Sequence, residues 1–125
     1  MSRYVDGFVL PLPKKKLARY RQIAKVAAKV WRDHGALEYV ECVADQLTSK
    51  QDGKTYTSIF PKLARVKPGE VVVFSWITYK SKAEKNRIMK KVMADPRLAD
   101  LMDPASMPFD MKRMAWAGFK PIVEA

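Results

Sequence analysis

Five residues of the sequence carry groups that could do chemistry in otherwise apolar surroundings. They are His34, Glu41, Trp76, Asp110 and Arg113. A histidine or a carboxylate in such surroundings can move a proton, because burial changes its pKa. An arginine can bind an anion through two parallel hydrogen bonds. We therefore expect a site that binds or transforms a small organic molecule, either anionic or aromatic, with His34 or Glu41 moving a proton and Arg113 binding an anion.

His34 and Cys42 are the single histidine and the single cysteine of the chain. A transition-metal site built from such side chains usually needs three or four ligands, so we expect no metal site and no cofactor. One histidine can still act as a general base or as a haem axial ligand. The alternative is a structural histidine at a helix C-terminus. The lone cysteine excludes an internal disulfide, which suits the cytoplasm, and Cys42 is expected to be buried opposite Glu41.

Two carboxylates, Asp6 and Glu41, fall within apolar strands, each on a face with aromatic neighbours. The aromatic strand faces are Tyr4/Asp6/Phe8, Tyr39/Glu41 and Phe74/Trp76. If all three face the same interior, both carboxylates are buried and need partners, and Arg113 is the best candidate. The result is either a structural ion pair that fixes strand order or dimer register, or a site in which an unpaired carboxylate of raised pKa transfers protons.

The stretch MPFDMKRMAWAGF (107–119) places Asp110 and Arg113 at the start of an apolar run. Arg113 shares a strand face with two alanines and a phenylalanine, which leaves room for a pocket floor or for the close approach of a helix. Four methionines near this stretch could line an adaptable pocket or fill gaps in the core. They are Met102, Met107, Met111 and Met114.

The elements that must position these residues follow from periodicity and turn signals. Apolar and β-branched runs predict strands over 4–12, 36–44, 71–79 and 111–123. An apolar period of about 3.6 residues predicts a helix over 14–34 that ends at Gly35. The capping box of Ser81 and Glu84 begins a second helix, which ends at Asp95–Pro96. Residues 45–69 form a polar excursion with a short strand near 55–60, and 96–110 form a loop with at most one helical turn.

The order β-α-β-β-α-β predicts an α+β fold of one domain over residues 1–125. Right-handed crossovers give a ferredoxin-like plait, a four-stranded antiparallel sheet with both helices on one face. The strand over 71–79 is apolar on both of its faces. The helix-free face therefore needs a cover, and we expect a homodimer in which the two sheets face each other.

Five blocks of the sequence carry a resemblance to a known family. They are YVDGFVLPLPK (4–14), VWRDHGALEYVECVAD (30–45), VVFSWITY (72–79), KVMADPR (91–97) and MPFDMKRMAWAGF (107–119). In this order they resemble the signature blocks of the YbaA-like family, a domain-of-unknown-function family placed in the dimeric α/β-barrel superfamily. The resemblance implies the face-to-face dimer and no established activity.

The superfamily gives a weaker analogy. It includes cofactor-free quinol monooxygenases, haem-degrading monooxygenases and muconolactone isomerases, which use a cleft between sheet and helices or inside the barrel. Quinol monooxygenases of this fold use an asparagine and a tryptophan four residues apart on one strand. Here Val72 stands four residues before Trp76, and the one asparagine is Asn86. The monooxygenase pattern is therefore incomplete, and fold alone does not carry function.

The formal charge of +11 indicates a second functional hypothesis, the binding of nucleic acid or another polyanion. Fourteen of the 24 basic residues lie within 14–32 and 80–91, and an outward stripe on the first helix holds Arg21, Lys25, Lys29 and Arg32. The strand over 71–79 lacks the Lys/Arg-Gly-aromatic-Gly pattern of RNA-binding plaits, so a solvated basic face is the simpler interpretation. A third hypothesis is a protein-interaction module without chemistry. No segment has the composition of a membrane helix or a secretory signal.

Overall fold

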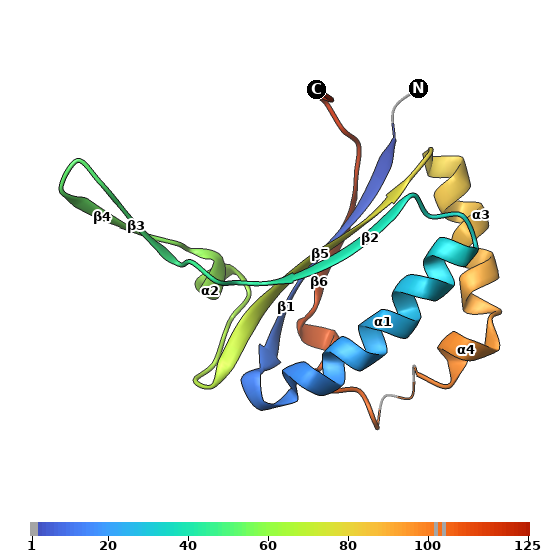
Figure 1. Cartoon of the computed structure of the whole chain (residues 1–125), viewed down its shortest axis with the longest axis horizontal. Coiled ribbons are helices and arrows are strands. Elements are labelled where there is room, and N and C mark those ends of the chain that lie inside the picture. The colour runs from blue at the N-terminus through green and yellow to red at the C-terminus, as the bar shows by residue number, and fades with distance from the viewer. Residues whose placement is uncertain (1–2, 102, 104) are drawn as a thin grey trace.

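The computed structural model describes residues 3–101, 103 and 105–125, and these form a mixed α+β fold (Figure 1). Four strands make an antiparallel sheet, as predicted, and their order is β2-β5-β1-β6. They are β1 (Tyr4–Pro13), β2 (Glu38–Val43), β5 (Glu70–Tyr79) and β6 (Ala115–Phe119). A separate hairpin consists of β3 (Thr48–Gln51) and β4 (Lys54–Thr57). The helices are α1 (Leu17–Asp33), α2 (Phe60–Leu63), α3 (Lys82–Met93) and α4 (Pro96–Ala99), with 3-10 turns η1 (Lys14–Lys16) and η2 (Met111–Arg113).

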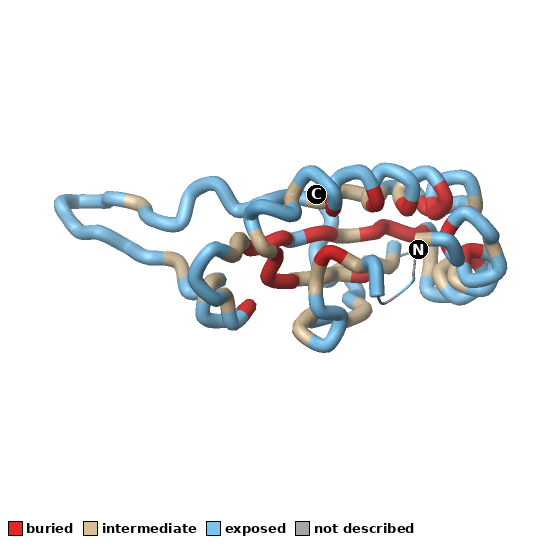
Figure 2. The backbone as a smooth tube through the Cα atoms, turned by 90° about the horizontal axis from the view of Figure 1, so that it is seen from below, coloured by how far each residue is buried: buried red, intermediate tan, exposed pale blue. Residues whose placement is uncertain are grey.

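The two long strands β1 and β5 form the centre of the sheet. Their register places Asp6 opposite Ile77 and Phe8 opposite Ser75. Ile77 lies in the main core together with residues of α1, α3 and α4, so these helices cover one face of the sheet. Figure 2 shows buried positions on the side of α1 that is turned toward the strands. The helix-covered face therefore holds Asp6, Phe8, Ser75 and Ile77.

Both long helices form for the reasons that the sequence indicates. The buried residues of α1 recur at helical spacing and are Tyr20, Ile23, Ala27, Val30 and Trp31. The helix ends before Gly35, whose φ of +117° favours glycine. At the start of α3 the Ser81 hydroxyl accepts a hydrogen bond from the Glu84 N–H at 3.1 Å, as predicted. The Glu84 carboxylate binds Arg87.

Two segments differ from the predicted elements. The excursion over 45–69 contains the β3–β4 hairpin, which projects from the body of the molecule (Figure 1), and the short helix α2. Asp52 and Gly53 form the turn of the β3–β4 hairpin, with φ of 52° and 76°. The last strand is shorter than 111–123, because Asp110 accepts a hydrogen bond from the Lys112 N–H at 3.0 Å and starts the turn η2 there.

The helix-free face of the sheet carries the alternate strand residues. Phe74 and Phe119 on this face are 42% and 55% exposed. Cys42 also lies here and is exposed, so the prediction that it is buried is wrong. Its strand β2 lies at the edge of the sheet, and Cys42 is on the face opposite to α1 and α3.

Candidate functional site

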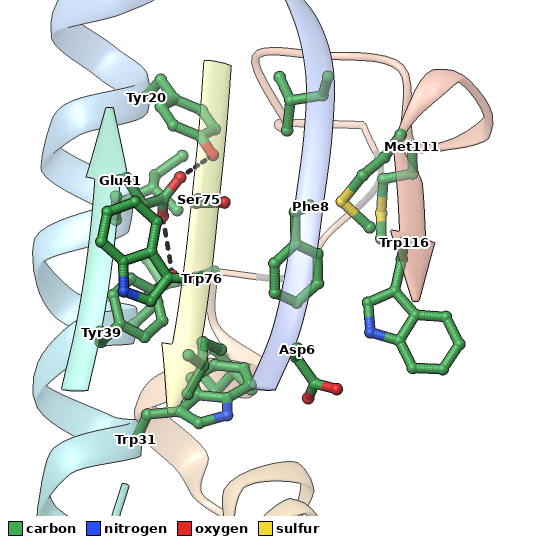
Figure 3. Close-up of a pocket in the computed structure, with 18 of the residues that line it drawn as sticks. Asp6, Phe8, Tyr20, Trp31, Tyr39, Glu41, Ser75, Trp76, Met111 and Trp116 are labelled. Carbon is green, nitrogen blue, oxygen red and sulfur yellow. Dashed lines mark hydrogen bonds between the residues drawn. The ribbon is translucent and has the colours of Figure 1, made fainter. Parts of the chain in front are cut away.

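A cavity of about 320 Å³ lies between the helix-covered face of the sheet, α1, α3 and the segment that leads into β6. Its walls are mostly apolar and aromatic. Figure 3 shows the side chains of its sheet floor together with Tyr20 and Trp31 from α1 and Met111. Met107, Met111 and Met114 all line it, whereas the fourth methionine of the predicted group, Met102, lies outside the described residues.

One row of side chains crosses all four strands of the floor. Glu41 is paired with Ser75, Ser75 with Phe8, and Phe8 with Trp116. Neighbouring strands are about 4.8 Å apart, so the row runs roughly 14 Å from the carboxylate at one edge to the indole at the other. The cavity therefore has a polar end on β2 and an aromatic end on β6.

At the polar end of the cavity, the Glu41 carboxylate accepts hydrogen bonds from two tyrosines. The Tyr39 hydroxyl donates to Oε2 at 2.8 Å, and the Tyr20 hydroxyl donates to Oε1. Burial and the neighbouring carboxylate raise the pKa of both phenols well above the usual value of 10.0. The tyrosines are therefore fixed hydrogen-bond donors, and they link α1 to the edge strand β2.

A second polar group, centred on Asp6, lies beside the row. The Asp6 side chain is buried, with 1% of its residue surface exposed. Its carboxylate accepts hydrogen bonds from the Tyr79 hydroxyl at 3.0 Å and from the Lys85 ammonium at 2.8 Å. Tyr79 in turn accepts from the Trp31 indole at 3.2 Å. Burial and the Asp6 charge raise the pKa of Tyr79.

Lys85 joins this group to the aromatic end of the cavity. Its Nζ lies 4.8 Å from the centre of the Trp116 ring and 5.3 Å from that of Tyr4. Both distances are within the range of a cation–π contact. The ammonium therefore stays inside the molecule, held by one carboxylate and two aromatic faces.

Glu41 is the one residue of the five predicted that contributes a polar group to this cavity. Trp76 borders it, but its indole N–H donates to Glu38 at 2.9 Å and its ring packs against Phe74, on the helix-free face. The prediction that Phe74 and Trp76 share an interior with Asp6 and Glu41 is therefore wrong. Asp6 pairs with Ile77, and this register turns Trp76 to the other side.

His34 lies at the C-terminal end of α1, where its Nε2 contacts the Asp95 carboxylate at 2.8 Å. Asp95 also binds Arg97 at 2.8 Å, and Arg97 reaches Asp33 at 2.8 Å. Hydrogen bonds from Arg97 and His34 lower the pKa of Asp95. This cluster fixes α4 against the end of α1, which favours the structural interpretation of His34.

Arg113 binds neither Asp6 nor Glu41, so the predicted partnership is wrong. Its guanidinium holds Glu70 with two hydrogen bonds of 2.7 and 2.8 Å and donates to the Arg65 carbonyl at 2.6 Å. The hydrogen bonds from Arg113 lower the pKa of Glu70 to about 2. Asp110 caps the turn η2 beside it. Neither Asp110 nor Arg113 is among the described residues that line the cavity.

Sequence reasoning did not select Tyr20, Ser75 or Lys85 as site residues. Tyr20 stands in the apolar stripe of α1, where a hydroxyl gives no separate signal. Lys85 is one of six basic residues over 80–91, and its inward position depends on the docking of α3. Asp6 was expected to be buried and to need a partner, but local sequence does not identify the residue that supplies it.

The basic stripe on α1 is partly engaged within the chain. Lys29 pairs with Asp33 at 3.4 Å, and the Arg32 guanidinium binds the carbonyls of Ala36 and Leu37. Within the described part of the chain, no three metal-binding side chains form a cluster. The helices seen over the same residues are too short or too polar to cross a membrane.

Comparison with known proteins gives a family but no activity. The family model described as "Protein of unknown function (DUF1428)" matches residues 3–111. "Uncharacterized protein YbaA" of Escherichia coli (strain K12) is 41% identical over 122 residues, which cover 98% of both chains, and the Shigella flexneri protein of the same name matches equally. Among solved structures, "De novo designed protein Foldit4" aligns over 99% of this chain and 100% of its own, with 13% identity and a TM-score of 0.42, too low to support an argument. The chain belongs to the DUF1428 family.

Proposed function

We propose that this protein binds a small, largely apolar organic molecule in the cavity between the sheet, α1 and α3. The observation that carries the proposal is the cavity itself, about 320 Å³ of space lined by aromatic and methionine side chains. Pockets for small molecules usually measure about 300–1,000 Å³ and combine apolar walls with a few convergent polar groups. Glu41 with its two tyrosines and Lys85 with Asp6 are such groups.

Filling the cavity should abolish this binding. Ala24 lines it from α1, so Ala24→Phe places a ring inside the space. We expect the affinity for the neutral fluorescent probe N-phenyl-1-naphthylamine to fall at least about tenfold, a loss of about 1.4 kcal/mol. Fluorescence titration measures it. Ala18→Phe on the exposed side of the same helix is the matched control and should bind like the unaltered chain. Equal binding by both variants would place the probe elsewhere and contradict the proposal.

We also infer that the fold is a ferredoxin-like plait and that two copies associate through their helix-free sheet faces as a dimeric α/β barrel. The strand order β2-β5-β1-β6 with α1 and α3 on one face supports the plait. On the described strand residues of the helix-free face there is no lysine or arginine, although the chain carries +11. Two basic molecules can approach there without direct repulsion.

Aromatic contacts extend this face beyond the sheet. The ring of Phe60 on α2 lies 6.1 Å from that of Phe74, and Phe74 lies 5.7 Å from Trp76. Ile59 and Leu63 beside Phe60 are 72% and 66% exposed. A second copy that covers the sheet would also shield this apolar extension from water.

A charge on this face should separate the copies. Phe74→Asp would bury two carboxylates against an apolar partner surface, so we expect the dimer dissociation constant to rise at least about tenfold. Sedimentation velocity at several concentrations measures it. Val26→Asp on α1 is the control, because Val26 is similarly exposed, at 39%, but lies away from this face. A monomeric unaltered chain at micromolar concentration would contradict the dimer.

A further inference from the structure

The cavity carries an unbalanced negative charge. Two carboxylates line it, Asp6 and Glu41, together with one ammonium, that of Lys85. Lys85 binds Asp6 at 2.8 Å, so these two charges compensate each other. Among the lining residues that the structure describes, Glu41 has only tyrosine hydroxyls as partners. Both of its oxygens are bound by phenol groups, and neither phenol supplies a positive charge.

The surroundings of Glu41 suit a positively charged partner. Each carboxylate oxygen can accept more than one hydrogen bond, so the two tyrosines leave acceptor capacity on both oxygens. Ser75 is the next side chain on the row, followed by the ring of Phe8 (Figure 3). Aromatic faces attract organic cations, and a carboxylate beside them provides the counter-charge.

We propose that the cavity takes an organic ammonium, a protonated amine on an aromatic or branched aliphatic body. Its ammonium hydrogen-bonds to Glu41, and its body lies over Phe8 toward Met89 and Trp116. This inference rests on the proposed binding function and names its ligand class. It replaces the anionic ligand expected from the sequence, because Arg113, the arginine of that expectation, is engaged by Glu70.

The test uses three probes of one size and different charge: 2-phenylethylamine, 2-phenylethanol and phenylacetate. Isothermal titration calorimetry at neutral pH gives their affinities for the full chain. We expect the amine to bind at least about tenfold more tightly than the acid, because its ammonium can form a charge-assisted hydrogen bond with Glu41, whereas the carboxylate of the acid is repelled there. In Glu41→Gln the amine should lose about tenfold in affinity, while the alcohol changes by less than about twofold.

Glu38→Gln is the matched control, because Glu38 lies on the same strand β2 but on the helix-free face, bound to Trp76 and Thr78. It should leave all three affinities unchanged. Binding of the alcohol to Glu41→Gln shows that this variant keeps a folded cavity. If the acid binds as tightly as the amine, or the amine preference survives in Glu41→Gln, the ammonium inference is wrong and the cavity proposal stands. If neither these probes nor N-phenyl-1-naphthylamine binds, both are wrong.

Discussion

Replacing Asp6 with alanine is expected to lower the free energy of unfolding by about 3–5 kcal/mol, as for other buried ion pairs that lose one partner. Asp6 is 1% exposed and binds both Lys85 and Tyr79. Without it, the Lys85 ammonium, whose side chain is 13% exposed, faces the apolar cavity without a counter-ion. Chemical denaturation followed by circular dichroism measures the change.

Two further variants show whether charge is the cause. Asp45→Ala removes an exposed carboxylate and should change stability by less than about 0.5 kcal/mol. The double replacement Asp6→Leu with Lys85→Met removes both charges and should restore much of the stability that Asp6→Ala loses. If Asp6→Ala costs less than about 1 kcal/mol, the buried pair is not the constraint that its geometry indicates.

The long elements were predictable because their signals are local. The apolar stripe of α1, the glycine that ends it and the Ser81 cap of α3 each lie within one stretch of chain. The turn η2 was not predicted, because its residues lead directly into the apolar run of β6 and its geometry depends on one cap. Asp110 supplies that cap. Arg113, the last residue of the turn, binds Glu70 of β5 and so holds the turn against that strand.

The site was predicted only in part because it depends on contacts between distant segments. Alternation correctly placed Asp6 with Phe8, but it could not set the phase of β5 relative to β1. A shift of one residue would exchange Trp76 with Ser75 or Ile77 on the cavity face. The pairing of Asp6 with Ile77 sets the phase of β5 relative to β1, and these two residues are 71 positions apart in the chain. Lys85 reaches Asp6 across a similar separation.

Replacing Arg113 with alanine should lower the free energy of unfolding at neutral pH, because the chain loses two hydrogen bonds between charged groups. The guanidinium joins η2 to the start of β5 through Glu70 and to the Arg65 carbonyl. Met111 and Met114, on either side of Arg113, both line the cavity. Arg113, which was expected to bind an anion, therefore holds in place the segment that carries Met111 and Met114 at the cavity wall.

This loss of stability should depend on pH. The folded-state pKa of Glu70, about 2, is below its ordinary value of 4.5. The pair therefore stabilises the folded state fully above about pH 4.5, and this contribution falls as the pH drops toward 2. The difference in stability between the unaltered chain and Arg113→Ala should shrink over this range in denaturation experiments. Lys112→Ala, which alters an exposed neighbour, should show little change in stability at any pH.

Arg113→Lys keeps the charge without the two-pronged geometry and should recover only part of the stability. A gap that persists unchanged down to pH 2 would assign the effect to the Arg65 carbonyl and to side-chain packing instead of the Glu70 pair.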